Sequence, residues 1–93
     1  LDDSKCAHTI KGYIGHTGSV LEVALIRDRG GGLIDSCSFD KQIKVWSINH
    51  CLCVQTLKAK WLAYCLVYAH DEILVSGHNN GSIQMWNLDT GLC

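Results

Sequence analysis

The chain has 93 residues, 47% of them apolar, and eight basic and nine acidic residues give a formal net charge of −1. This length allows one small domain at most, and the charge balance argues against nucleic acid and against an anionic membrane as partners. The longest uncharged apolar run, residues 61–69, is shorter than the roughly 20 residues that a membrane-spanning helix needs.

Six cysteines in so short a chain could form a disulfide scaffold. They include residues within apolar, strand-like segments such as 33–39 and 63–68, where a free cysteine behaves as a small hydrophobic side chain. We therefore favour reduced thiols, which are typical of cytoplasmic or nuclear proteins.

Short strands separated by turn residues are predicted along the whole chain, and helical periodicity is absent. The run VLEVALI at 20–26 is continuously apolar around one glutamate, which is typical of a strand buried on both faces. Three glycines in the loop 27–32 permit a turn with positive φ. The predicted strands are 5–11, 20–26, 33–38, 42–48, 53–58, 62–68, 72–76 and 82–88, with the start of another at Cys93.

An internal repeat relates the two halves of the chain. Trp46 and Trp86 are 40 residues apart, and the same offset matches further pairs. Residues 6–12 align with 53–59 at an offset of 47, and the additional residues lie in 13–18 and in the glycine loop. The other pairs at the offset of 40 are Ser36 with Ser76, Asp40 with Asn80, Ile43 with Ile83, and Cys53 with Cys93. Four short strands in a unit of about 40 residues predict an all-β fold of antiparallel, four-stranded propeller blades.

The Gly-His pair at Gly15 and His16, followed by SCSFD at 36–40 and IKVWS at 43–47, resembles the WD-repeat β-propeller family. The family signature runs from Gly-His to Trp-Asp, and this chain departs from it because a serine and an asparagine follow its two repeat tryptophans. The resemblance covers nearly the whole chain. The chain is also similar to the C-terminal propellers of ring-finger or zinc-finger WD-repeat proteins.

This resemblance implies a division of the chain by blades. Residues 1–12 would be the outer strand of a preceding blade, 13–58 a first blade, and 59–93 a second blade that lacks most of its outer strand. Propellers typically have about 4 to 8 blades, so we expect two blades of a larger propeller. In the alternative, copies of the chain assemble and each lends its first strand to the next.

His16, Ser36 and Asp40 have the composition of a hydrolase triad. The resemblance implies instead a structural tetrad with Trp46, in which the serine hydroxyl accepts the buried indole N–H. Catalysis would need an exposed nucleophile and an oxyanion hole, and a serine in the middle of a strand has neither. We therefore expect a protein that is not an enzyme and needs no cofactor.

The second repeat keeps only part of this tetrad, namely Ser76, Asn80 and Trp86. Ala59 and Lys60 stand where the first repeat has Gly-His. A lysine cannot accept the hydrogen bond that a histidine could, so we expect a looser second blade, or a Lys60 that points into solvent.

Two other sets of residues could carry binding chemistry. His50, Cys51 and Cys53 are zinc-ligand types, but no second cluster has ligand spacing, and Cys53 recurs at a repeated strand position. We therefore expect packing and no metal site. Three aromatic residues could stack on bases, but two of them fall in a predicted inner strand, which favours the core. They are Trp61, Tyr64 and Tyr68.

The resemblance implies a rigid, non-enzymatic scaffold that binds other proteins on its faces. Phe39 is the strongest candidate contact, because exposed aromatic side chains anchor protein interfaces; in the alternative, Phe39 packs on the neighbouring blade. Substrate recognition in a ubiquitin ligase is the alternative, and a hydrolase that uses His16 and Ser36 is the least favoured. By position in the repeat, the implied partner-facing residues are Ser19, Leu21, Phe39, Ala63, Cys65 and Asn79.

Overall fold

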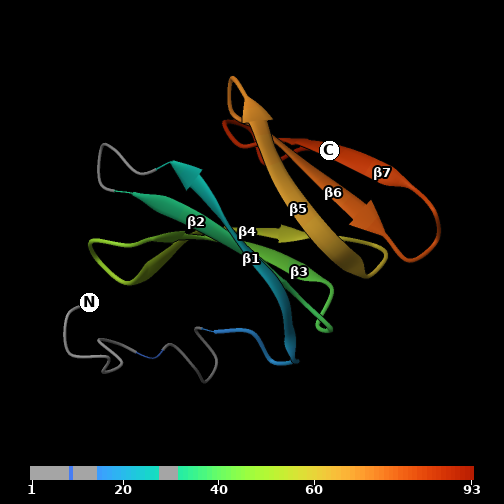
Figure 1. The fold of residues 1–93 in the computed structure, drawn as a ribbon, viewed down its shortest axis with the longest axis horizontal. Helices are drawn as coiled ribbons and strands as arrows, with labels where there is room; N and C mark the ends of the chain where they lie inside the picture. Colours follow the sequence, from blue (N-terminus) through green and yellow to red (C-terminus); the bar gives the residue numbers. More distant parts are fainter. Residues whose placement is uncertain (1–8, 10–14, 28–31) are drawn as a thin grey trace.

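The computed structural model describes residue 9 and residues 15–27 and 32–93, and these residues form two antiparallel sheets (Figure 1). The predicted strand 5–11 lies outside the described residues, apart from Thr9. The first sheet contains β1 (Val20–Arg27), β2 (Leu33–Ser38), β3 (Gln42–Ser47) and β4 (Leu52–Lys58). The second sheet contains β5 (Ala63–His70), β6 (Ile73–His78) and β7 (Ile83–Asn87).

The strands follow chain order within each sheet, which confirms the predicted all-β class and its antiparallel meanders. After β7 the chain turns back, and Leu92 makes a single bridge to Asn87 at the place where a fourth strand would begin. Asp71 and Glu72 alone connect β5 to β6, both with positive φ, of 52° and 64°. Such a two-residue turn matches the right-handed twist of the strands that it joins.

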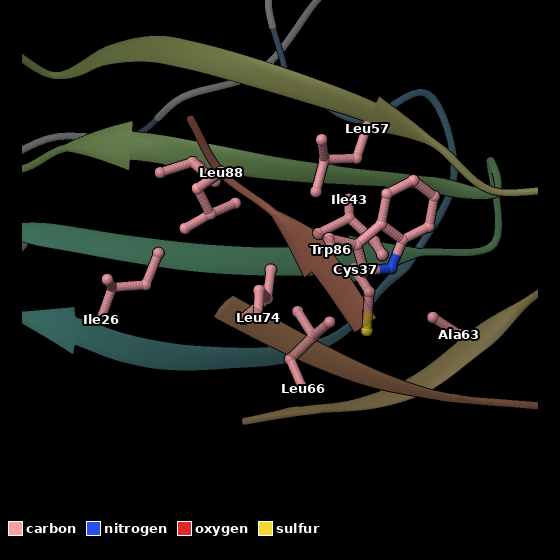
Figure 2. Packing of buried hydrophobic residues seen from close by; sticks show 10 residues of the cluster. Ile26, Cys37, Ile43, Leu57, Ala63, Leu66, Leu74, Trp86 and Leu88 are labelled. Carbon is pink, nitrogen blue, oxygen red and sulfur yellow. The ribbon is translucent and has the colours of Figure 1, made fainter. Parts of the chain in front are cut away.

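The hydrophobic core lies between the two sheets, and Figure 2 shows its side chains converging from both. β1 and β2 of the first sheet lie against β5 of the second. Each large apolar side chain buried there contributes about 1.5 to 3 kcal/mol relative to exposure. The buried members are Ile26, Cys37, Ile43, Val45, Leu57, Ala63, Leu66, Leu74, Trp86 and Leu88.

The prediction that residues 20–26 are buried on both faces is wrong for the described chain. Val20, Val23 and Leu25 are each more than half exposed. A strand is buried on both faces only when a layer covers each face. Here the second sheet covers one face of the first sheet, and of the described residues the loop before β1 covers only the part of the other face near Ser36 and Trp46.

Two carboxylates lie in β1 and β2 beside the core. Glu22 accepts a hydrogen bond from the Leu66 amide, which ties β1 of the first sheet to β5 of the second. Asp35 is fully buried; its Oδ1 accepts the Ala24 amide at 3.1 Å, while Oδ2 has no hydrogen-bond partner. Burial raises the pKa of Asp35 to about 6; the Ala24 bond opposes this shift, and the charge of Glu22 adds to it.

We predict that Asp35→Asn stabilises the protein at pH 7.5, by about 1 to 2 kcal/mol. The folded-state pKa of Asp35 exceeds its ordinary value of 3.8. The stability that neutral Asp35 contributes is therefore complete below about pH 4 and is lost as the pH rises through about 6. Thermal unfolding of both proteins between pH 4 and 7.5 measures the difference, with Asp89→Asn, at an exposed position, as control. Parallel pH profiles for the wild type and Asp35→Asn would contradict the prediction.

Candidate functional site

A chain of hydrogen bonds joins four side chains on the face of the first sheet that points away from the second sheet. The Trp46 indole Nε1–H donates to Ser36 Oγ at 2.9 Å, and His16 Nε2 lies 2.6 Å from the same oxygen. His16 Nδ1 lies 2.9 Å from Asp40 Oδ2. Ser36 is only 4% exposed, so this chain satisfies a buried hydroxyl and a buried indole together.

Asp40 anchors the loop before β1 to the turn between β2 and β3. Its carboxylate accepts the amides of Thr17 at 3.0 Å and Gln42 at 2.8 Å, besides the contact with His16. Burial by itself would raise the pKa of Asp40, but these hydrogen bonds outweigh it and hold the pKa below its usual range. The close approach of the loop requires Gly18, because a Cβ there would lie 2.9 Å from the Asp40 amide nitrogen.

The second sheet builds the same arrangement with a histidine from a different place. Trp86 Nε1–H donates to Ser76 Oγ at 2.9 Å, and His78 Nε2 lies 2.6 Å from that oxygen. His78 Nδ1 lies 2.9 Å from the carbonyl oxygen of Trp61. A carbonyl oxygen only accepts, so Nδ1 is the donor, and the Ser76 hydroxyl is free to donate to Nε2. Trp86, Ser76 and His78 are all buried.

The expectation of a partial tetrad in the second repeat is therefore corrected. Asn80 takes no part in this hydrogen-bonded arrangement. Its Oδ1 instead accepts hydrogen bonds from the Ser82 backbone amide at 3.0 Å and from the Ser82 hydroxyl at 2.6 Å. Lys60 is exposed, and its ammonium lies 5.3 Å from the centroid of the Trp61 ring. Sequence reasoning missed His78, although alternation along β6 places residues 76 and 78 on one face of the sheet.

The six residues implied to face a partner fall into different environments. Phe39 is 56% exposed, at the turn after β2, and its amide donates to the Ser19 carbonyl at 3.0 Å. Ala63 is 2% exposed within the core, which removes it from any contact surface, and Leu21 packs partly against the same core. The remaining exposed members are Ser19, Cys65 and Asn79.

The residues of the other candidate sites do not come together as a binding site in the part of the chain that the structure describes. No group of three or more His, Cys, Asp or Glu side chains there could hold a metal ion, and the five described cysteines are free thiols. Tyr64, predicted in the core, is more than half exposed. Within the described ranges, no helix is long and apolar enough to cross a membrane.

We predict that His78→Leu destabilises the protein by about 1 to 3 kcal/mol, because it leaves the buried Ser76 hydroxyl without an acceptor. Lys60→Ala serves as the matched control and should change stability by less than about 0.5 kcal/mol. Urea unfolding followed by tryptophan fluorescence measures both. The assignment fails if Lys60→Ala is the more damaging substitution.

Comparisons with known proteins agree with this geometry. Residues 4–47 match the family of the WD domain, G-beta repeat. The chain is 31% identical over 90 residues to nuclear distribution protein PAC1 of Arthroderma otae, a match covering 85% of this chain and 20% of that protein. It is 32% identical over 84 residues to COMPASS component SWD3 of Saccharomyces cerevisiae, covering 87% of this chain and 26% of that protein. The chain thus spans about a fifth to a quarter of the length of these relatives.

Two solved structures share the fold. The WD40 beta propeller domain of Doa1 superposes with a TM-score of 0.72 at 23% identity, over 83% of this chain and 26% of that one. The computationally designed Ika4 protein superposes with a TM-score of 0.66 at 26% identity, over 83% of this chain and 46% of that one. The match of residues 4–47 and the similarity to the two relatives, together with the repeated Trp–Ser–His arrangement on each sheet, show that the chain belongs to the WD-repeat β-propeller family.

Proposed function

We propose that this chain is a non-enzymatic scaffold that binds a protein partner through one end of its two sheets. The observation that carries the proposal is Phe39, an aromatic side chain held more than half exposed on a turn that Asp40 and His16 fix in place. A rigid, exposed aromatic residue loses little conformational entropy on binding, which suits it to anchor an interface.

The residues around Phe39 give this end a basic character. We define the end surface as six exposed residues, Ser19, Phe39, Lys41, Lys58, Lys60 and Asn79. Backbone hydrogen bonds hold the loops that carry these residues. The Ala59 amide donates to the Lys41 carbonyl, and the Asn79 amide donates to the Leu62 carbonyl, both at 2.9 Å. The turns after β2 and β6 lie at the same end of the two sheets (Figure 1).

Charge separates this end from the opposite one. Asp40 is engaged by His16 and two amides, which leaves the three lysines as the charged groups that the end surface presents. The opposite end carries acidic residues, namely Asp71 and Glu72 in the β5–β6 turn and Asp89 beyond β7. We therefore propose a partner segment that combines acidic side chains with an apolar residue for Phe39. The net charge of −1 makes nucleic acid the weaker candidate.

The names of the relatives support a role in assemblies. One is called a COMPASS component and another a nuclear distribution protein. These names, together with the free cysteines, support a cytoplasmic or nuclear location for this chain. They do not point to a ubiquitin ligase.

A hydrolase is the second candidate, because Ser36, His16 and Asp40 have the hydrogen bonds of a triad, and Ser36 and His16 line an open pocket of about 170 Å³. Two observations favour the structural role. The Ser36 hydroxyl already accepts the Trp46 indole N–H, and the second sheet repeats the arrangement with a carbonyl oxygen in place of the aspartate. Ester hydrolysis that disappears in Ser36→Ala would reverse this preference.

We predict that Phe39→Ala weakens binding of a selected acidic, apolar-containing peptide at least tenfold, the loss typical of an interface anchor. The peptide is selected from a displayed library on the wild-type chain, and binding is measured by titration calorimetry. Leu92→Ala is the matched control, because Leu92 is an exposed apolar residue at the opposite end. Unchanged binding in Phe39→Ala, or loss of the folded state, would contradict the surface role.

A further inference from the structure

The turn between β6 and β7 contains an asparagine followed directly by a glycine, Asn80 and Gly81. Both residues are exposed, and Figure 1 shows this turn at one end of the second sheet. The turn lies at the end of the strands, so a layer packed on either face of the sheet does not cover it. An asparagine side chain can react with the peptide nitrogen that follows it, and glycine hinders this reaction least because it has no Cβ.

Gly81 leaves its peptide nitrogen open toward the Asn80 side chain. Its φ is +87°, and a Cβ at this position would meet no atom within 4 Å. The Gly81 amide donates one hydrogen bond in the turn, to the His78 carbonyl at 3.1 Å. This bond lies at the exposed end of a hairpin, where local opening costs less free energy than inside the sheet. The nitrogen is therefore accessible as a nucleophile once this one bond opens.

Ser82 holds the Asn80 side chain over the same peptide unit. The two hydrogen bonds that Asn80 Oδ1 accepts from the Ser82 amide and hydroxyl, at 3.0 and 2.6 Å, form an Asx turn. The side chain in such a turn curls back toward the backbone that follows it, which keeps the reacting groups together. When the side-chain carbon is attacked, negative charge develops on Oδ1, and two donors already point at that oxygen.

We propose that Asn80 is a site of spontaneous deamidation, and that Ser82 stabilises the oxyanion that develops during the reaction. The Gly81 nitrogen attacks Asn80 Cγ and loses its proton, while the side-chain NH2 group takes up a proton and leaves as ammonia. The product is a cyclic imide, which water opens. Addition of water at Cγ gives aspartate, and addition at the backbone carbonyl carbon gives isoaspartate. One water is consumed and one ammonia released, and no other reactant is needed.

The first sheet shows that the aspartate product fits this turn. Asp40 stands at the equivalent position and accepts the Gln42 amide at 2.8 Å, as Asn80 accepts the Ser82 amide. Isoaspartate instead adds a methylene to the backbone between two strands whose register is fixed. Either product adds a negative charge next to the end surface. The reaction itself is independent of the partner proposed above.

Mass spectrometry of the whole chain, incubated at neutral pH and physiological temperature and then digested, tests the site. Peptides that contain position 80 should gain the mass difference between NH2 and OH, and an isoaspartate methyltransferase should label part of them. The other asparagines of the chain are internal controls, and the first two are exposed in turns as Asn80 is. They are Asn49, Asn79 and Asn87. We expect Asn80 to convert before any of them.

Two variants test the roles of Gly81 and Ser82 separately. Gly81→Lys copies the first sheet, where Lys41 has a φ of 65° at the equivalent position, so the turn should stay folded. The lysine side chain crowds the attacking nitrogen and should reduce the rate at Asn80 to that of the other asparagines. Ser82→Ala removes the hydroxyl donor and keeps the amide donor, and should slow the reaction about twofold to tenfold. Circular dichroism establishes that both variants are folded.

The outcomes that would overturn the proposal differ for its two parts. An Asn80 that stays unmodified, or equal conversion at all the asparagines, would remove the site, as would wild-type conversion in Gly81→Lys. An unchanged or faster reaction in Ser82→Ala would remove the role of Ser82.

Discussion

The hydrogen bond from a buried tryptophan indole to a serine hydroxyl is the interaction on which each sheet depends. Trp46 and Ser36, like Trp86 and Ser76, belong to neighbouring strands and meet at 2.9 Å. The serine can donate its own proton onward only if a further acceptor is present, and a histidine nitrogen supplies it in both sheets. Three side chains thereby hold two strands and a connecting loop in one register, without an unpaired polar atom among them.

The two sheets form the same hydrogen-bonded arrangement with histidines from different places in the sequence. The comparison shows what the arrangement requires. The first sheet takes its histidine from the loop before β1 and orients it with Asp40. The second takes its histidine from β6 and orients it with a backbone carbonyl. The requirement is therefore an imidazole with one donating and one accepting nitrogen, and the aspartate can be replaced. This substitution favours a structural role over a catalytic one.

Much of the fold followed from the sequence, because strand alternation and the repeated tryptophan are local signals. The seven described strands lie within a few residues of the predicted ranges. The prediction that residues 20–26 are buried on both faces was wrong. An apolar run shows that a strand can be buried, but whether it is buried depends on which layers lie against its two faces. His78 does not occupy the Gly-His position of the repeat, so the repeat pattern does not indicate its role; its place on the same face of β6 as Ser76 does. The interior position of Ala63 depends on how the sheets stack, which the sequence pattern does not encode.

Hydrogen exchange at the indole nitrogens, followed by proton NMR, tests the central role of the Trp–Ser–His chains most directly. Trp61, which is only partly buried and stands outside these chains, provides the internal reference. We expect the indole protons of Trp46 and Trp86 to exchange far more slowly than that of Trp61. We also expect Ser76→Ala to accelerate exchange at Trp86 more than at Trp46. Equal exchange rates at all three indoles would contradict the account.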